Sequence, residues 1–328
     1  MIIESRRIII YTRLIRHWTG MLLGKSYWHA PQTLGKRFTP GQLAGYFNDL
    51  SRKTHWNGPT DQDGLPLNKN LSNELFHFPT TIIQKALGHW DIWLQSNKKA
   101  DSDLGLFKKS ADWLVKSQDD NGGWPIWSII NLTYASKYSA MTQGEGISVL
   151  ARAYALTSDE IYLKCAKKAL SPLLLPISMG GTCRVVQHGL ILEETPQDRE
   201  ATILNGWIFA LFGLYDFLLA LRNRDEIAYK AEDTLNNSLR TLISILPRYD
   251  RVYWSNYDLA GNIASPFYHH LHIAQLQALE LTFPEYRKDF SHWRETFRRQ
   301  SSSCLNYARA ILRKTQQKLR RPPNVVLR

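Results

Sequence analysis

The chain contains little cysteine and no long uninterrupted apolar run. Only three of its 328 residues are cysteines, without Cys-x-x-Cys or other metal-ligand spacing, so neither a disulfide framework nor a cysteine-based metal site is expected. The most apolar stretch, 206–221, is shorter than the roughly 20 residues that span a bilayer, and it contains Asp216. We therefore expect a reducing, cytoplasmic compartment and no transmembrane segment.

Acidic residues are outnumbered by basic ones. Lys and Arg total 41 and Asp and Glu total 29, which gives a net charge of +12, while aromatic residues make up 12% of the chain. A surface with this balance attracts polyanions, and aromatic rings suit the flat faces of sugars or bases. An acidic polysaccharide, an anionic membrane and nucleic acid all fit this charge, although no specific nucleic acid is expected, because the sequence contains no recognisable nucleic-acid-binding module.

Much of the positive charge lies at the two ends of the chain. Arginines interrupt the apolar runs near the N-terminus, which disfavours a signal peptide and favours a basic amphipathic helix. Such a helix either packs on the domain or makes a peripheral contact with an anionic membrane. We divide the chain into a basic N-terminal helix with its connection, 1–40, a central domain, 41–300, and a basic C-terminal helix or tail, 301–328.

Helical periodicity dominates the sequence from residue 80 onward. Helical stretches are predicted at about 80–95, 104–118, 147–154, 159–170, 204–221, 226–246, 267–282 and 285–316. Because strongly apolar helices alternate with more polar ones, we predict a mainly α fold in which helical hairpins wind into an (α/α) toroid or barrel. Residues 172–200 begin with two prolines and continue through a Gly-Gly pair to an alternating segment, which predicts a small β-hairpin inserted between the toroid helices.

The segment 268–275 has the densest set of reactive side chains. On a helix Tyr268, His272 and Gln275 share one face, because they are four and then three residues apart. His269 and His272 have the i, i+3 spacing of a metal pair but no acidic residue or third ligand beside them. Zinc ligands, buried structural histidines and an acid/base or substrate-binding face all stay open, and we favour the last.

Two glutamates, Glu193 and Glu194, precede Pro196 at the expected tip of the hairpin. Carboxylates in such a place serve either as a general base or as an exposed acidic turn, and the pattern alone favours neither. The turn at 122–124, Gly-Gly-Trp, has two interpretations as well. Trp124 either faces a substrate or, as we favour, packs on the next helical hairpin.

Taken together, these segments resemble the C-terminal catalytic domain of the D-glucuronyl C5-epimerases, which convert D-glucuronate to L-iduronate within heparosan or heparan chains. The motifs that match in order and spacing include Gly122-Gly123-Trp124-Pro125, Tyr138-Ser139-Ala140-Met141, Gln143-Gly144, Glu193-Glu194, Leu204-Asn205-Gly206, Tyr257-Asp258-Leu259 and Tyr268-His269 with His272-Ile273. The match spans roughly residues 41–300. It implies an (α/α) barrel, a carbohydrate racemase or epimerase that needs no cofactor and no metal, and a heparosan-like substrate, with a homodimer as one open oligomeric state.

The resemblance also assigns roles to individual residues. It implies that Tyr268 and Glu194 are catalytic and that Asn205 and Tyr257 bind substrate. We add further candidates for substrate binding, namely His269, His272, Glu193, Gln143, Tyr138, Tyr46 and Arg184.

The chain departs from the family pattern at two positions. Family members have a tyrosine after the paired glutamates, whereas this chain has Thr195, whose hydroxyl is no comparable acid or base near neutral pH. An arginine that often follows the Tyr-Asp-Leu motif is replaced by Ala260, and Arg184 or Arg199 is the candidate to compensate.

We therefore predict a polysaccharide uronate C5-epimerase. Glu194 and Tyr268 would exchange the C5 proton on opposite faces of the sugar ring. A uronan lyase and a catalytically inactive protein that binds acidic glycans are the alternatives.

Overall fold

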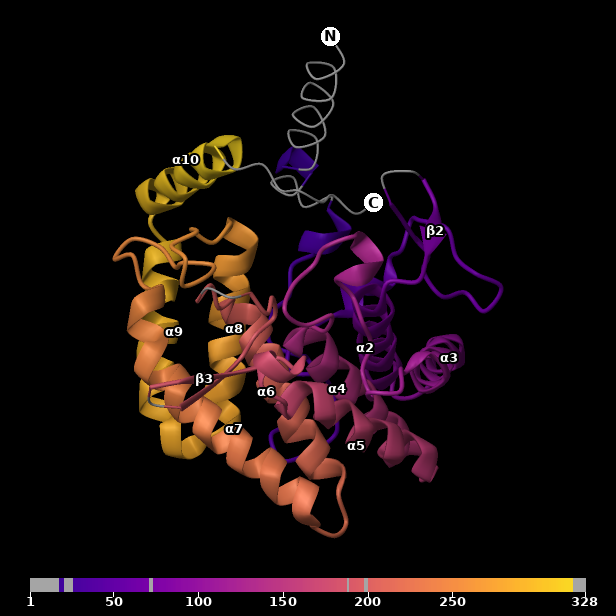
Figure 1. Cartoon of the computed structure of the whole chain (residues 1–328). Coiled ribbons are helices and arrows are strands. Elements are labelled where there is room, and N and C mark those ends of the chain that lie inside the picture. The colour runs from indigo at the N-terminus through magenta and orange to yellow at the C-terminus, as the bar shows by residue number, and fades with distance from the viewer. Residues whose placement is uncertain (1–17, 21–25, 71–72, 188, 198–199, 321–328) are drawn as a thin grey trace.

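Nine α-helices that lie wholly within the described residues dominate the computed structural model (Figure 1). The structure describes residues 18–20, 26–70, 73–187, 189–197 and 200–320. The helices are α2 (Pro79–Gln95), α3 (Asp101–Ser117), α4 (Ala140–Thr157), α5 (Glu160–Leu174), α6 (Leu204–Ala220), α7 (Glu226–Ile245), α8 (Pro266–Thr282), α9 (Arg287–Ser301) and α10 (Cys304–Arg320). Most of the predicted N-terminal amphipathic helix falls outside the described residues. Among the described residues, no helix is long and apolar enough to cross a membrane.

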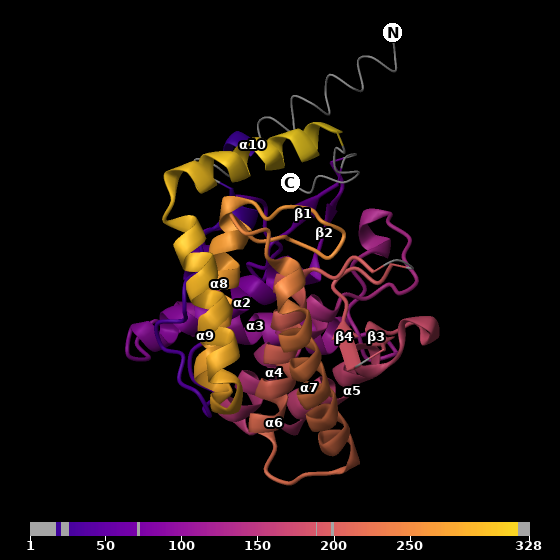
Figure 2. The same cartoon turned by 90° about the vertical axis from the view of Figure 1, so that its left-hand side faces the viewer.

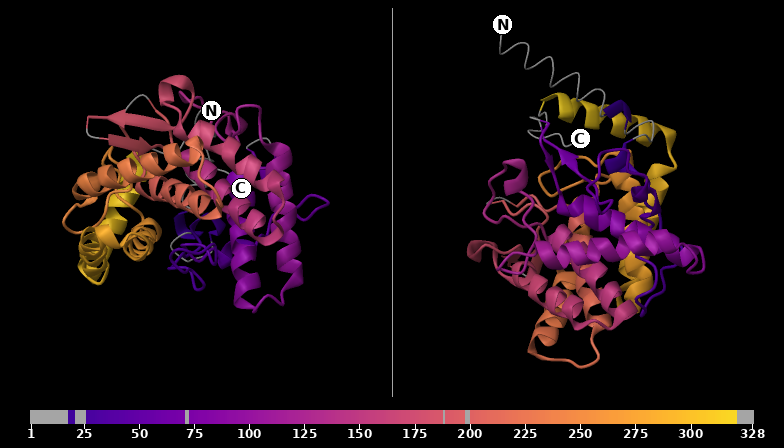
Figure 3. Two further views of the ribbon diagram at one scale, coloured as in Figure 1. Left: turned by 90° about the horizontal axis from the view of Figure 1, so that it is seen from below. Right: turned by 90° about the vertical axis from the view of Figure 1, so that its right-hand side faces the viewer.

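Helices α2 to α9 form four successive hairpins. Helices α2, α4, α6 and α8 are neighbours in this order, and each packs on the helix that follows it in the sequence. Figure 3 (left) shows the hairpins following one another along an arc. Helix α6 is apolar around most of its circumference and is buried on most of it, because it lies between α4 and α8 and is covered by α7. The predicted mainly α class is thus confirmed, and closure into a toroid stays a prediction.

Two small antiparallel hairpins interrupt the helices. Strand β3 (Cys183–Val186) pairs with β4 (Gly189–Leu192) between α5 and α6, which confirms the predicted insertion. Glu193 and Glu194 directly follow β4, so their expected position at the tip of the hairpin is wrong. The turn joins the two strands six residues earlier, where Val186 pairs with Gly189. The hairpin of β1 (Asn68–Lys69) and β2 (Leu75–Phe76) was not predicted, because residues 30–75 show only turn signals.

Helices α4 and α6 make the closest helix contact of the arc. A Cβ atom added at Gly213 would lie 2.3 Å from the carbonyl oxygen of Gly144, so only glycine allows this approach. Arg152, two turns after Gly144 on α4, and Asp216, about one turn after Gly213 on α6, form a fully buried ion pair of 2.5 Å. Arg152 also donates to the carbonyl oxygen of Gly45 at 3.3 Å, which joins the loop before α2 to the same contact.

The C-terminal part of the chain turns where the sequence predicted one continuous helical stretch. Residues 302–303 separate α9 from α10, and α10 lies across one end of α8 and α9 (Figure 2). Its Ala310 is completely buried in a small apolar cluster with Trp254, Ile263 and Ala264. Helix α10 is therefore attached to the loop that precedes α8.

Replacing Arg152 by methionine should destabilise the fold strongly. The variant leaves the Asp216 carboxylate buried without its partner, and such a loss typically costs about 3–5 kcal/mol. Urea denaturation measures the difference. The control is Arg224→Met, because Arg224 and Glu232 form an exposed pair of a kind worth less than about 1 kcal/mol. An equal loss of unfolding free energy in the two variants would show that the buried pair stabilises the fold no more than the exposed pair.

Candidate active site

The starts of α6 and α8 bring the central residues of the candidate site together. Asn205 is the second residue of α6, and Tyr268 is the third residue of α8. Ser265 caps α8 by accepting a hydrogen bond from the backbone N–H of Tyr268. The side-chain amide of Gln275, two turns further on, donates to the carbonyl oxygen of Asn205 at 3.0 Å. This bond holds α6 and α8 in register at the site.

Glu194 reaches this place from the loop after β4. Its side chain lies over Gly206, where an added Cβ would be 2.0 Å from its Oε2 atom. Burial, followed by the charge of Glu193, raises the pKa of Glu194 to about 8. Its buried Oε2 atom has no hydrogen-bond partner among the described residues. An ionised Glu194 is therefore a stronger base than an exposed carboxylate.

Two tyrosines share the electrostatic environment of Glu194. The rings of Tyr257 and Tyr268 are 4.6 Å apart, centroid to centroid. Burial raises the pKa of Tyr268, the charge of Glu194 raises it further, and a side-chain hydrogen bond with Tyr257 acts in the opposite direction. Burial and the charge of Glu194 also raise the pKa of Tyr257. Both phenols consequently keep their protons at neutral pH and are weaker acids than an exposed tyrosine.

The two histidines next to Tyr268 are neutral and bonded to the protein. The Nε2–H of His269 donates to the carbonyl oxygen of Phe297 at 2.9 Å, and its Nδ1 accepts from Ser255. His272 Nδ1 lies 3.0 Å from the hydroxyl oxygen of the same serine. Burial lowers the pKa of His269 well below its usual range and that of His272 to about 3. Neither histidine therefore supplies a positive charge that would lower the pKa of Tyr268.

His272 differs from His269 in one respect. Its buried Nε2 atom has no hydrogen-bond partner within the described part of the chain, and the same holds for the side-chain oxygens of Asn205 and Gln275. Buried polar atoms are costly unless something bonds them. These three atoms are thus suited to the hydroxyl groups of a ligand. Among the described residues, no group of three or more His, Cys, Asp or Glu side chains is arranged to hold a metal ion.

Arg184 and Glu193 form an ion pair at the edge of the site. The Nε–H of Arg184 donates to Glu193 Oε1 at 2.7 Å, and its guanidinium also bonds the carbonyl oxygen of Gln197. The backbone carbonyl of Glu193 accepts from the N–H of Ala140, the first residue of α4, at 3.0 Å. Glu193 therefore anchors the loop that carries the catalytic candidate Glu194.

Gln143 and Tyr138 form hydrogen bonds around the turn that contains Trp124, and burial, followed by the charge of Glu145, raises the pKa of Tyr46. The side-chain amide of Gln143 bonds both the backbone N–H and the carbonyl of Trp124, at 3.3 and 3.1 Å. Tyr138 donates its hydroxyl to Asp119 at 2.7 Å, and Tyr46 is completely buried. Substrate binding by these residues stays a prediction. The same contacts, with Trp124 buried, agree with a packing role for the Gly-Gly-Trp turn.

Sequence reasoning missed a second buried carboxyl, that of Glu145 on α4. The side-chain amide of Gln84 on α2 lies 3.2 Å from each of its carboxyl oxygens. Burial raises the pKa of Glu145 to about 8, the charge of Lys53 lowers it, and the charge of Glu194 raises it further. The available signal was a glutamate between two glycines in a helical stretch whose one other charged residue is Arg152.

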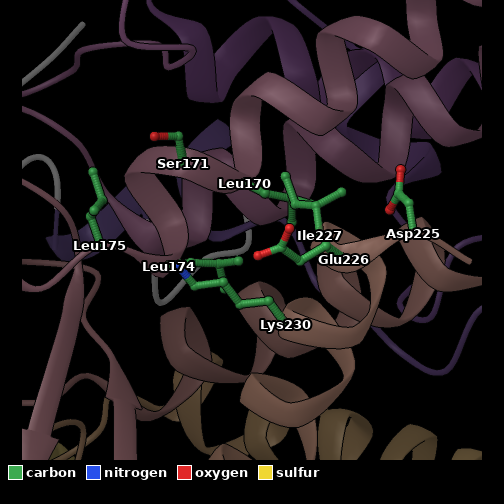
Figure 4. Close-up of a pocket in the computed structure, with 8 residues that line it drawn as sticks. All are labelled: Leu170, Ser171, Leu174, Leu175, Asp225, Glu226, Ile227 and Lys230. Atoms are coloured by element: carbon green, nitrogen blue, oxygen red, sulfur yellow. The ribbon is translucent and has the colours of Figure 1, made fainter.

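Two hollows of the described surface are lined by none of the residues predicted for the site. One of about 410 Å³ lies between α5 and the start of α7, lined by Leu170, Ser171, Leu174, Leu175, Asp225, Glu226, Ile227 and Lys230 (Figure 4). It contains none of the predicted site residues. Another, of about 490 Å³, lies between the segment 29–34 and the outer side of α8. His29 lines it and also contacts Tyr268, with the ring centroids 5.8 Å apart.

The fold and the site define a helical protein that places a carboxyl group beside two phenols, which are groups suited to general acid–base chemistry. The chain belongs to the family described as D-glucuronyl C5-epimerase C-terminus, whose sequence model matches residues 118–299, more than half of the chain. The family resemblance predicted from the motifs is thereby confirmed. Glu194, Asn205, Tyr257 and Tyr268 lie inside the matched range, and α10 lies outside it.

Two curated relatives illustrate the match. The chain is 35% identical over 193 residues to D-glucuronyl C5-epimerase of Caenorhabditis elegans, covering 52% of this chain and 31% of that protein. It is 30% identical over 162 residues to an uncharacterised protein of Methanocaldococcus jannaschii, covering 48% of this chain and 51% of that one. The matched part thus spans about a third and about half of the length of these relatives.

The buried carboxyl of Glu194 should make stability depend on pH. Its pKa of about 8 in the folded protein exceeds the ordinary value of 4.5, so the folded state binds this proton more tightly than the unfolded state. The free energy of unfolding should fall as the pH rises from about 5 to 8. In the Glu194→Gln variant, the free energy of unfolding should decrease less steeply with pH, by up to about 1.4 kcal/mol per pH unit.

Urea denaturation at several pH values measures this slope. The control variant is Glu285→Gln, which changes an exposed glutamate and should keep the slope of the unmodified protein. A Glu194→Gln variant with the same slope would contradict the assignment of a raised pKa to Glu194.

Proposed function

We propose that the protein is a polysaccharide uronate C5-epimerase that converts D-glucuronate to L-iduronate residues in a heparosan-like chain. The observation that carries this proposal is the grouping of Glu194 with Tyr257 and Tyr268 in a chain of the D-glucuronyl C5-epimerase family. The substrate would be an acidic polysaccharide, which suits the net charge of +12. The arc of hairpins would be part of a toroid that receives the polymer near the starts of α6 and α8.

Glu194 would act as the base of the reaction. The hydrogen on C5 of a uronate is adjacent to a carboxylate, so its removal leaves an enediolate-like dianion. Glu194 in its ionised form would take this proton while the C–H bonding electrons move toward the uronate carboxylate. The raised pKa of Glu194 makes its ionised form a stronger base, and this form becomes the major one only above about pH 8.

Tyr268 would act as the acid on the opposite face of the ring. Its phenol would donate a proton to C5, form the new C–H bond and become a phenolate. The hydroxyl of Tyr257 would stabilise that phenolate through its hydrogen bond. Exchange with solvent would then return a proton to Tyr268 and remove one from Glu194. Each turnover would therefore carry one solvent hydrogen into C5.

Other residues of the cluster would orient the sugar. The side-chain oxygen of Asn205 and the Nε2 atom of His272 lack partners among the described residues, so they could bond sugar hydroxyls. Thr195 would take no part in proton transfer, because its hydroxyl does not ionise near neutral pH. Glu194 and Tyr268 would then suffice as the proton-transfer pair.

Incubation with heparosan in heavy water tests this function. The unmodified protein should introduce deuterium at C5 and produce L-iduronate, both detectable by nuclear magnetic resonance. Tyr268→Phe and Glu194→Gln should each lower the exchange rate by at least about 100-fold, because each removes a proton-transfer group. Tyr229→Phe is the control, since Tyr229 is an exposed tyrosine on α7, and it should exchange normally.

Two other results would overturn the proposal. Ultraviolet absorbance of an unsaturated uronate would identify a lyase, which abstracts the same proton and then eliminates the 4-linked sugar. Binding of heparosan by folded protein without deuterium exchange on any uronan would identify a catalytically inactive binder.

A further inference from the structure

The proposed reaction needs positive charge near the uronate carboxylate, because charge builds up there when the C5 proton leaves. Two cations near the cluster already have partners. Arg184 bonds Glu193 and Gln197, and Lys53 donates to the carbonyl oxygens of residues 27 and 28 at 3.1 and 3.2 Å. After the Tyr-Asp-Leu motif the chain has Ala260, which carries no charge.

Helix α10 brings a third cation, Lys314, to the tyrosine pair. Its Nζ atom lies 5.4 Å from the centroid of the Tyr257 ring, and that ring contacts Tyr268. The ammonium group donates one hydrogen bond, to the carbonyl oxygen of Ile263 at 2.6 Å. Because an ammonium group has three N–H donors, this bond leaves capacity for a carboxylate.

The position of Lys314 is fixed by contacts on both sides of it along the helix. Gln317 accepts a hydrogen bond from the backbone N–H of Ile263 at 3.0 Å and donates to the carbonyl oxygen of Gly261 at 3.2 Å. Ala310, one turn before Lys314, is buried against Trp254. These contacts attach α10 to the loop that carries Tyr257. This loop leads into the start of α8 (Figures 1 and 2).

We propose that Lys314 is a substrate-binding residue of the active site, where its ammonium group pairs with the carboxylate of the uronate that is epimerised. The C-terminal helix, which lies outside the matched range 118–299, would then complete the site and replace the positive charge absent at Ala260. This inference rests on the proposed function.

The charge state of Lys314 agrees with this role. Burial and the charge of Lys318 lower its pKa to about 8, and the charge of Asp258 acts in the opposite direction. The ammonium form therefore predominates at neutral pH. A partly desolvated ammonium attracts a carboxylate more strongly than an exposed one, because less solvent screens the pair.

The test compares Lys314→Met with Lys318→Met. Lys318 lies one turn further along the same helix, with its Nζ atom 4.9 Å from the centroid of a Trp18 ring, so the two variants make the same change in net charge. In deuterium exchange on heparosan, Lys314→Met should lower kcat/KM by about 100-fold. Lys318→Met should lower kcat/KM less than about threefold, as expected of a charge outside the centre of the substrate-binding site. Lys314→Arg should keep most of the rate, which separates loss of charge from loss of folding.

A binding measurement gives a second readout. The unmodified protein should bind heparosan more tightly than heparosan whose carboxyl groups have been reduced to alcohols, and Lys314→Met should lose most of this preference. Calorimetry with the two polymers measures it without turnover.

Three results would overturn the inference while the unmodified protein still exchanges deuterium. They are equal losses in the two methionine variants, full activity of Lys314→Met, and an unchanged preference for carboxylated polymer. Absence of exchange by the unmodified protein would instead contradict the proposed function.

Discussion

The close approach of α4 and α6 is the contact on which the rest of the structure depends. It exists because Gly144 and Gly213 leave no side chain between the two helices, and the buried pair of Arg152 and Asp216 holds them at that separation. The start of α6 is thereby fixed beside α4, and Glu194 packs over its third residue, Gly206. A helix contact made of glycines and one ion pair therefore sets the position of the proposed base.

The same packing sets the chemistry of the site. Carboxyl and phenol groups that leave water bind their protons more tightly, which gives Glu194 and Glu145 raised pKa values and keeps Tyr268 protonated. Histidine responds in the opposite sense, so His269 and His272 are neutral. Burial, with the charges of neighbouring carboxylates, thus favours the protonated forms of Glu194 and Tyr268 and the neutral forms of the two histidines.

Features of the fold that depend on local sequence were predictable. The helical stretches follow from apolar residues at 3.6-residue spacing, and the hairpin of β3 and β4 follows from alternation between turn residues. The predicted bounds of elements were wrong where contacts between residues far apart in the sequence decide where a helix or a turn lies. Residues 285–316 divide into α9 and α10, because α10 buries Ala310 against the loop around Trp254, a contact that periodicity does not contain. The paired glutamates follow β4 because strand register, which short alternating patterns specify weakly, places the turn earlier.

For the site, the sequence by itself determined the residue types and the family motifs, including Glu194, Asn205, Tyr257 and Tyr268. Only the tertiary structure decided which of them meet and in which protonation state. It bonded Gln143 to Trp124 and Tyr138 to Asp119, and it joined Arg184 to Glu193. It also placed Glu145 of α4 in the electrostatic environment of Glu194, and Lys314, which lies outside the matched range, beside Tyr257. The physical reason is that pKa values and hydrogen-bond partners depend on burial and on neighbours from other helices, and no local pattern along the chain contains either.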